Sequence, residues 1–450
     1  MHDIMIITTI AAFLCTIAII FWRPHINEAI PAAAGAIVVL LSGSVALSDV
    51  RVIAATIGEA AVTIMATIVM AGVLESFGFF RWAAERMMTQ AQGSGYRLFW
   101  HVILLCFLMT MFLNNDGSIL ITTPILLMLL YRLNLKPHQK VPYLISGALV
   151  ATASSASIGV SNLVNLIALE IVGMDLYMQT AMMFVPSFLG LALLSLLLFV
   201  NFYRVIPRKL PPLKPGHWHM PPGDRDHPLK GDAAPVPKEN RARLMRNILL
   251  FVFAVRIGLF AASMIGVPIA LVAVLGSAAL LVWRWHYLRV SPRDILKKTP
   301  WHIFLFAFSM YVIVYGLSNI GLTAFLAERL EPVLSGSALA ASIGMGALLS
   351  VLSNVFNNHP ALMVGTMSLT QMSLDPLTLK IAYLASVIGS DFGSLLFPVG
   401  TLATLMWMHL VRKGHVHIRW SEYVKVTFRV IPVSSAFTLV LFAYWVEWLF

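Results

Sequence analysis

Two pairs of adjacent asparagines interrupt apolar runs, and they are the residues best placed to do chemistry. One pair is Asn114 and Asn115, and the other is Asn357 and Asn358. Each side-chain amide offers two N–H donors and a carbonyl acceptor, which suits binding of a polar solute by hydrogen bonds. Hydrocarbon cannot satisfy such groups, so broken backbone inside an apolar run is tolerated only around a cavity or inside protein.

A second polar break follows each asparagine pair further along the chain. The first extends from Ser154 to Asn165 and the second from Gly389 to Thr404. Serine and threonine hydroxyls both donate and accept hydrogen bonds. The predicted substrate-binding set therefore combines the amides and hydroxyls of both pairs and both breaks: Asn114, Asn115, Ser155, Asn162, Asn165, Asn357, Asn358, Thr401 and Thr404.

Three ionisable residues accompany these groups and are the candidates for proton coupling: Asp116, Asp391 and His359. Asp116 could equally cap the helix that follows it, and Asp391 could be a structural hydrogen-bonding residue. No cluster of Arg or Lys stands beside them, which argues against a multivalent anion. A small, neutral, hydroxyl-rich solute suits the residues better.

The composition places these residues in a membrane. The chain is 59% hydrophobic and 11% charged, with a mean hydropathy of +0.84, which excludes a soluble globular protein. Basic residues cluster in short loops, so the net charge of +11 does not indicate nucleic-acid binding. Cys15 and Cys106 lie in apolar runs and form neither a disulfide framework nor a thiolate metal cluster. We expect no cofactor and no metal site.

About 20 apolar residues cross a bilayer as a helix. The segments 98–133 and 338–374 have arms of about 15 residues around the asparagine pairs, so each is predicted to be a re-entrant hairpin. The expected fold is all-α and integral to the membrane, with two broken helices and about ten spans, near 4–22, 28–47, 53–78, 141–174, 178–204, 247–264, 267–288, 301–320, 381–411 and 428–449.

The order of span, span, hairpin, broken span and span occurs twice. With both termini outside, most of the 31 Lys and Arg residues face the cytoplasm, as do residues 205–245. The two units then have opposite orientations, which predicts an inverted repeat with a binding site near the bilayer midplane, as in secondary transporters. The predicted division is an extra span at 1–27, a first repeat at 28–204, a linker at 205–245, an extra span at 246–266 and a second repeat at 267–450.

Some other features have structural interpretations. The linker is rich in proline and charge and should be poorly ordered, and its His217 and His219 alone under-coordinate zinc. Residues 415–427 suit a helix in the inner interface. Glu59 and Glu75 are expected to pair structurally, with Arg256 as the candidate partner.

The breaks resemble those of the arsenite/antimonite efflux carrier family, within the ion transporter superfamily. The resemblance lies in Leu-Asn-Asn-Asp-Gly at 113–117, Ser-Asn-Leu-Val-Asn at 161–165, and Gly-Ser-Asp-Phe-Gly at 389–393 with Pro-Val-Gly-Thr at 398–401. It implies an inner-membrane carrier that expels arsenite or antimonite against inward proton movement and confers metalloid resistance. It also raises a cytoplasmic metalloid-stimulated ATPase as a candidate partner.

Three alternatives stay open beside this interpretation. The nearest is a sodium/proton antiporter, or another ion carrier of the same superfamily. A passive channel is the second. An intramembrane enzyme is the third, with Ser154 or Ser155, His101 and Asp116 as an imaginable triad, but the chain has no nucleophile-elbow or zinc motif. We therefore predict a protein that is not an enzyme.

Overall fold

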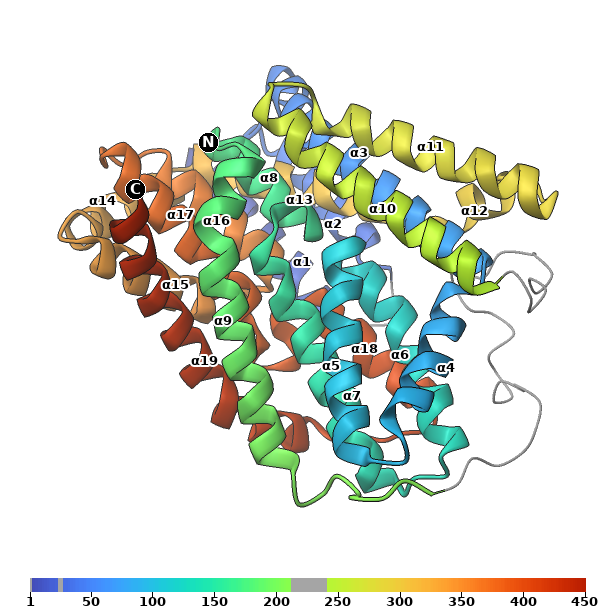
Figure 1. The fold of residues 1–450 in the computed structure, drawn as a ribbon. Helices are drawn as coiled ribbons and strands as arrows, with labels where there is room; N and C mark the ends of the chain where they lie inside the picture. The colour runs from blue at the N-terminus through green and yellow to red at the C-terminus, as the bar shows by residue number, and fades with distance from the viewer. Residues whose placement is uncertain (1, 23–26, 212–240) are drawn as a thin grey trace.

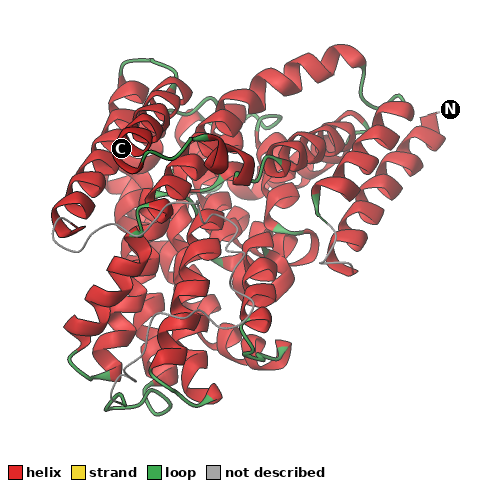
Figure 2. Ribbon diagram, turned by 90° about the vertical axis from the view of Figure 1, so that its right-hand side faces the viewer, coloured by secondary structure: helices red, strands yellow, loops and turns green. Residues whose placement is uncertain are grey.

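The computed structural model describes residues 2–22, 27–211 and 241–450, and this part of the chain is helical without a strand (Figures 1 and 2). Ten of its helices are long and apolar enough to cross a membrane. This confirms the predicted all-α membrane protein with about ten spans. The membership of the ten differs from the prediction: the first arms of both asparagine hairpins qualify, whereas the short helix at Ala29–Leu41 and the broken segment predicted at 141–174 do not.

The helices form two sets with one additional helix before each. α1 (His2–Trp22) precedes the N-terminal set, which consists of α2 (Ala29–Leu41), α3 (Leu47–Ser76), α4 (Phe79–Ala91), α5 (Gly95–Phe112), α6 (Asn115–Arg132), α7 (Pro137–Ala153), η1 (Ser154–Ser157), η2 (Gly159–Ser161), α8 (Leu163–Val172) and α9 (Leu176–Phe202).

α10 (Arg241–Met264) precedes the C-terminal set. This set consists of α11 (Ile269–Leu288), α12 (Arg293–Lys298), α13 (His302–Asn319), α14 (Leu322–Leu334), α15 (Ala338–Phe356), α16 (Asn358–Leu369), α17 (Pro376–Asp391), η4 (Gly393–Leu396), η5 (Pro398–Gly400), α18 (Leu402–Lys413) and α19 (Trp420–Leu449).

The two sets pack against each other reciprocally: a helix of one set contacts a helix of the other, and the counterparts of these two helices contact each other as well. α3 packs on α11 while α2 packs on α13, and α6 packs on α18 while α8 packs on α16. α9 and α19 run side by side (Figure 1). Such reciprocal packing is what an inverted repeat would produce. The repeat bounds and their opposite orientations in a bilayer remain a prediction.

Both predicted broken helices are confirmed. α7 ends at Ala153, and two short 3-10 turns separate it from α8, with Ile158 and Asn162 in extended conformation. α17 ends at Asp391 and is separated from α18 in the same way, with Phe397 and Thr401 extended. Runs of Ser, Gly and Pro favour turns over a continuous helix, which explains both positions.

A glycine lets the second break fold tightly on itself. A Cβ atom added to Gly400 would lie 1.8 Å from the carbonyl oxygen of Ser394. No residue with a side chain fits that approach, so the two 3-10 turns can stack only because position 400 is glycine.

The asparagine hairpins are pairs of antiparallel helices; three of the four arms are longer than expected and the second arm of the second hairpin is shorter. α5 and α6 have 18 residues each, and α15 and α16 have 19 and 12. The asparagines lie at the turns, as predicted. Whether the hairpins re-enter the membrane from one side stays a prediction.

Several expectations about the connections were wrong. The sequence did not predict α4, α12 or α14. Residues 415–419 are not helical, and α19 runs without interruption from Trp420, so the expected interfacial helix at 415–427 does not exist as a separate element. The last part of the predicted linker is helical, because α10 begins at Arg241. The predicted disorder, His217 and His219 lie outside the described residues.

Candidate functional site

Asparagine caps close the tips of both hairpins. Asn114 is the N-cap of α6, and its side-chain oxygen accepts a hydrogen bond from the Gly117 amide at 2.6 Å. Asn357 caps α16 with a φ of 74° and a ψ of 150°, a strained conformation that residues other than glycine rarely adopt. Its amide nitrogen donates to the Val399 carbonyl at 3.2 Å, so it ties the second tip to the second break.

The caps leave three side-chain amide atoms of the asparagine pairs without a hydrogen-bond partner. Asn114 Nδ2, Asn115 Oδ1 and Asn358 Nδ2 are buried and have no hydrogen-bond partner within the described part of the chain. A buried polar group without a partner costs about 1–3 kcal/mol, so native proteins rarely leave one unexplained. These atoms are two donors and one acceptor that a polar solute could satisfy.

The first break converges on Asp391 of the C-terminal set. Asn162 Nδ2 donates to Asp391 Oδ1 at 3.1 Å, and Asn165 Nδ2 donates to Oδ2 at 2.7 Å. The Ser155 hydroxyl oxygen lies 2.8 Å from Oδ2. Asp391 is completely buried. Three predicted substrate-binding residues are therefore engaged with a predicted proton-coupling residue in this conformation, which sequence reasoning treated as two separate groups.

The second break closes on itself. Thr401 caps α18, where its hydroxyl oxygen accepts from the Thr404 amide at 3.0 Å. The same hydroxyl donates to the Thr404 hydroxyl at 2.8 Å. The two breaks therefore differ: a carboxyl group from the C-terminal set engages the first, whereas in the second Thr401 and Thr404 bond to each other and the Ser394 hydroxyl has no partner among the described residues.

Sequence reasoning missed the tyrosines that hold the broken backbone. The Tyr383 hydroxyl donates to the Asn165 carbonyl at 3.2 Å, and the Tyr423 hydroxyl donates to the Leu395 carbonyl at 3.1 Å. Both tyrosines are fully buried. Each lies in a mostly apolar helix, and a buried Tyr usually has a polar partner. That rule could have identified them, although not their partners.

Gln179 of α9 was also missed. It is fully buried, and neither of its amide atoms has a partner among the described residues. It lies against the first break so closely that a Cβ atom on Gly159 would be 2.1 Å from its oxygen. The sequence did contain a signal for Gln179, because it is an amide side chain within an apolar span.

Arg256 does not pair with Glu59 or Glu75 as expected. It lies on α10, is 5% exposed, and donates to the carbonyl oxygens of Phe112, at 2.9 Å, and Leu113. These carbonyls end α5, where a cation is favourable because the helix dipole is negative there. Arg256 therefore fixes the first hairpin tip, while Glu59 accepts from the Ala270 amide at the start of α11.

A cavity of about 270 Å³ connects the two hairpins. Asp116 from α6 and His359 from α16 both line it, together with Phe306 of α13. His359 is 5% exposed, contacts the Phe306 ring edge-on at 5.6 Å, and lies 3.1 Å from the Asn358 side-chain oxygen through Nδ1. The structure thus brings two of the three predicted proton-coupling residues into one cavity, whereas Asp391 is not among its lining residues.

The rim of this cavity carries further ionisable side chains. Glu28 and His302 form a contact of 3.8 Å, and both side chains are partly exposed. His409 of α18 also lines the cavity. Among the described residues no group of three or more His, Cys, Asp and Glu side chains is placed to hold a metal ion.

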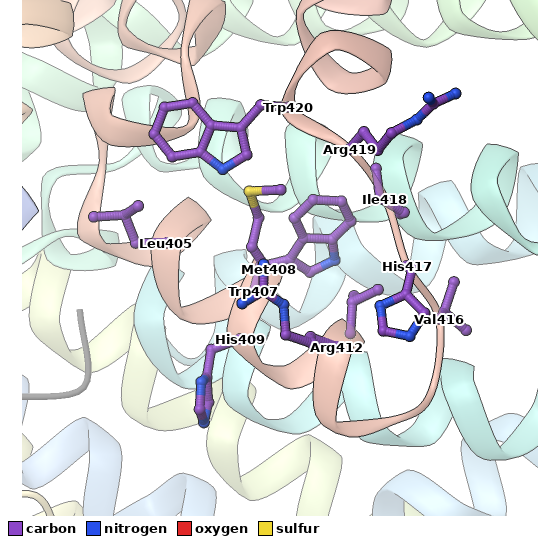
Figure 3. A pocket seen from close by; sticks show the side chains of 11 residues that line it. Leu405, Trp407, Met408, His409, Arg412, Val416, His417, Ile418, Arg419 and Trp420 are labelled. Carbon is purple, nitrogen blue, oxygen red and sulfur yellow. The ribbon is translucent and has the colours of Figure 1, made fainter. Parts of the chain in front are cut away.

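A second cavity of about 380 Å³ lies between α18 and the segment that leads into α19 (Figure 3). Its lining includes Trp407, Arg412, His417 and Trp420, and no predicted site residue. It is next to the first cavity, because Leu405 and His409 line both.

Comparisons with known proteins agree on one family. The family described as "Arsenical pump membrane protein" matches residues 8–446. A Bacillus subtilis (strain 168) protein that is named, provisionally, an arsenical pump membrane protein is 57% identical over 440 residues, which cover 98% of this chain and 99% of that protein. An Escherichia coli arsenical pump membrane protein is 28% identical over 441 residues, with 95% and 99% covered. One from Yersinia enterocolitica is 29% identical over 414 residues, with 91% and 92% covered. This multi-pass membrane protein therefore belongs to the arsenical pump membrane protein family, within the ion transporter superfamily.

Proposed function

We propose that this protein expels arsenite or antimonite, as the neutral acids As(OH)₃ and Sb(OH)₃, from the cytoplasm in exchange for protons. The names of its relatives in Escherichia coli and Yersinia support an arsenical substrate. Such an activity would make the chain a metalloid-resistance protein of the inner membrane. The names of the relatives mention neither antimonite nor protons, so these two parts of the proposal rest on the residues of this chain.

The observation that carries the proposal is the set of unpartnered amide atoms at both hairpin tips. Asn114 Nδ2, Asn115 Oδ1 and Asn358 Nδ2 are buried without partners, and the residues that follow the two pairs, Asp116 and His359, line the cavity. None of the described lining residues is Lys or Arg. A solute with three hydroxyl groups both donates and accepts hydrogen bonds, and without a charge it needs no cation.

The remaining predicted binding residues have different roles in this proposal. Asn357 already bonds to Val399, so it shapes the second tip. Ser155, Asn162 and Asn165 hold Asp391, and Thr401 and Thr404 hold each other, in the conformation described. These five side chains would reach the solute only after the breaks rearrange, as expected for a carrier that alternates between two states.

The cavity is the proposed entry route from the cytoplasm. Its rim lies near the start of α13 and along α18, next to helices whose last turns are basic: Lys297 and Lys298 in α12, and Arg412 and Lys413 in α18. Clusters of basic residues mark cytoplasmic ends. The proposed orientation therefore has both termini outside and the 205–245 connection inside.

A neutral solute gains nothing from the membrane potential, so uphill export needs a coupled ion. One proton moving inward across 100 mV supplies about 2.3 kcal/mol, in addition to the pH gradient. Asp116 and His359 face the cavity where a proton could exchange with water, and Asp391 lies between the two helix sets. We assign proton coupling to these three residues.

The test is arsenite uptake into everted membrane vesicles that acidify their interior. We expect accumulation that collapses with a protonophore and that is strongly reduced in Asp116→Asn. Asp375→Asn is the matched control, because Asp375 is an exposed helix cap outside the cavity. Full gradient-driven accumulation in Asp116→Asn would remove Asp116 from the coupling set.

Two other outcomes of the vesicle experiment would indicate a different function. Uptake that ignores the proton gradient would indicate a channel, and sodium movement without arsenite movement would indicate a sodium/proton antiporter. A cytoplasmic metalloid-stimulated ATPase remains a candidate partner, which co-purification with and without arsenite would test.

A further inference from the structure

If Asp391 is ionised, the Ser155 hydroxyl has two hydrogen-bond acceptors beside it and only one hydrogen to donate. The Ser155 hydroxyl oxygen lies 2.6 Å from the Thr152 carbonyl oxygen and 2.8 Å from Asp391 Oδ2. A hydroxyl has one hydrogen, so it can make a well-aligned hydrogen bond to only one of these acceptors. Both contacts are well-aligned hydrogen bonds only when the carboxyl group supplies the second hydrogen: Asp391 donates to Ser155, and Ser155 donates to Thr152.

The other contacts of Asp391 are compatible with this arrangement. The amide groups of Asn162 and Asn165 donate to Oδ1 and Oδ2, and a protonated carboxyl oxygen still has a lone pair to accept with. Among the described residues no Lys, Arg or His forms an ion pair with Asp391, which is fully buried. A buried charge without a counter-ion is costly, whereas a neutral carboxyl group with all its hydrogen bonds made is not.

The surrounding helices contribute few groups that titrate. α15 carries no ionisable side chain, and α16 carries only His359. α9 has Tyr177 in its first turn, and α19 has its charged residues toward its ends, at Glu422, Lys425, Arg429 and Glu447. Tyr383 on α17 and Asp116 of the first hairpin are the titratable groups that interact electrostatically with Asp391. Neither is a cation.

We propose that Asp391 holds the transported proton in this conformation and that Ser155 transmits its release. The inference rests on the proposed proton-coupled export. Once the breaks rearrange and expose the carboxyl group to water, its O–H bond breaks, the proton passes to that water, and the Ser155 hydrogen turns from the Thr152 carbonyl to the carboxylate. The Thr152 carbonyl in the last turn of α7 then loses its side-chain partner and keeps the contact with the Ser154 amide. One proton on α17 thereby controls the hydrogen bonding of the broken helix in the other set.

The experiment is infrared difference spectroscopy on the purified full-length protein in lipid, with arsenite as the probe. We expect a carbonyl stretching band of a protonated carboxyl group at neutral pH, which weakens when arsenite binds. Asp391→Asn removes the band, whereas Asp375→Asn, which replaces an exposed carboxylate outside the cavity, leaves it. The Asn variant should fold, because its amide can donate to Ser155 and the free Oδ1 of Asn165 can turn to accept from it.

Ser155→Ala provides a second measurement that does not depend on Asp391→Asn folding. Without the Ser155 oxygen the carboxyl hydrogen loses its acceptor, so the band should remain and move to higher frequency. Absence of the band in the unmodified protein, or a band that survives Asp391→Asn, or one that Ser155→Ala does not move, would overturn the proposal. Proton-driven arsenite uptake in vesicles would still stand in those cases, and its loss would instead refute the proposed function.

Discussion

Replacing Arg256 should loosen the first hairpin tip without unfolding the protein. The guanidinium group makes two hydrogen bonds, to the carbonyls of Phe112 and Leu113, and Leu113 is buried. In Arg256→Met the apolar stem is kept and both donors are lost. We therefore expect the effect to be confined to the end of α5 and the turn that contains Asn114.

The magnitude follows from the contacts. A hydrogen bond to a charged group contributes about 1.5–3 kcal/mol, so two would contribute about 3–6 kcal/mol. Removing a buried cation also removes its desolvation cost, and Arg256 Nη1 has no partner within the described structure. A net local loss of about 2–4 kcal/mol remains, and each 1.4 kcal/mol is a factor of ten, so tip opening should increase about 30- to 700-fold.

Hydrogen–deuterium exchange with mass spectrometry measures this directly. Peptides covering residues 109–118 should exchange faster in Arg256→Met, while peptides from the second tip around Asn357 should be unchanged. Arg256→Lys is the matched control, because it keeps the charge and one donor group and should restore part of the protection. Equal exchange at the first tip in the unmodified protein and in Arg256→Met would refute the assigned role of this arginine.

Three further outcomes are expected. Asn357→Gly should lower the melting temperature, because it loses the bond to Val399, and Asn357→Ala should lower it more, because alanine is strained at a φ of 74°; the reverse order would exclude backbone strain. Arg284 and Asp294 form a buried ion pair, so Arg284→Met should cost about 3–5 kcal/mol, and adding Asp294→Leu should recover much of it, as a thermal-melt cycle would measure. Hydrogen bonds from the start of α17 lower the pKa of Asp375, so its contribution to stability exists above the ordinary Asp pKa and disappears as the pH falls through the lowered value. Melting curves of Asp375→Asn should therefore show a smaller loss of stability in acid than those of the unmodified protein.

Hydropathy and residue type predicted the membrane class, the two breaks and the two tips, because each depends on local sequence. Segments rich in Ser, Gly or Pro favour turns over a continuous helix, so the interruptions after Ala153 and Asp391 could be placed closely. The helices α4 and α14 escaped prediction because mixed sequences such as 79–91 have no apolar run, although they pack as helices against the hairpins.

Tertiary contacts were the part that the sequence could not show. Ser155, Asn162 and Asn165 were identified as polar, but their convergence on Asp391 depends on two segments more than 200 residues apart. Likewise Arg256 was recognised as an isolated charge in a span, yet its partners are backbone carbonyls that have no signature in the sequence. Local patterns identify which groups need partners, whereas only the packed structure shows which partners they have.

The exchanged packing of α2 and α3 has a consequence for synthesis. Their main neighbours, α13 and α11, lie in the part of the chain that the ribosome makes later. When the N-terminal set leaves the translocon, α2 and α3 can pack on α1 and α8 but still lack these main partners, so part of their surface must face lipid or the insertion machinery. We therefore expect the nascent chain to remain sensitive to membrane proteases until α13 is complete, and a truncation after α9 to be degraded rather than to fold.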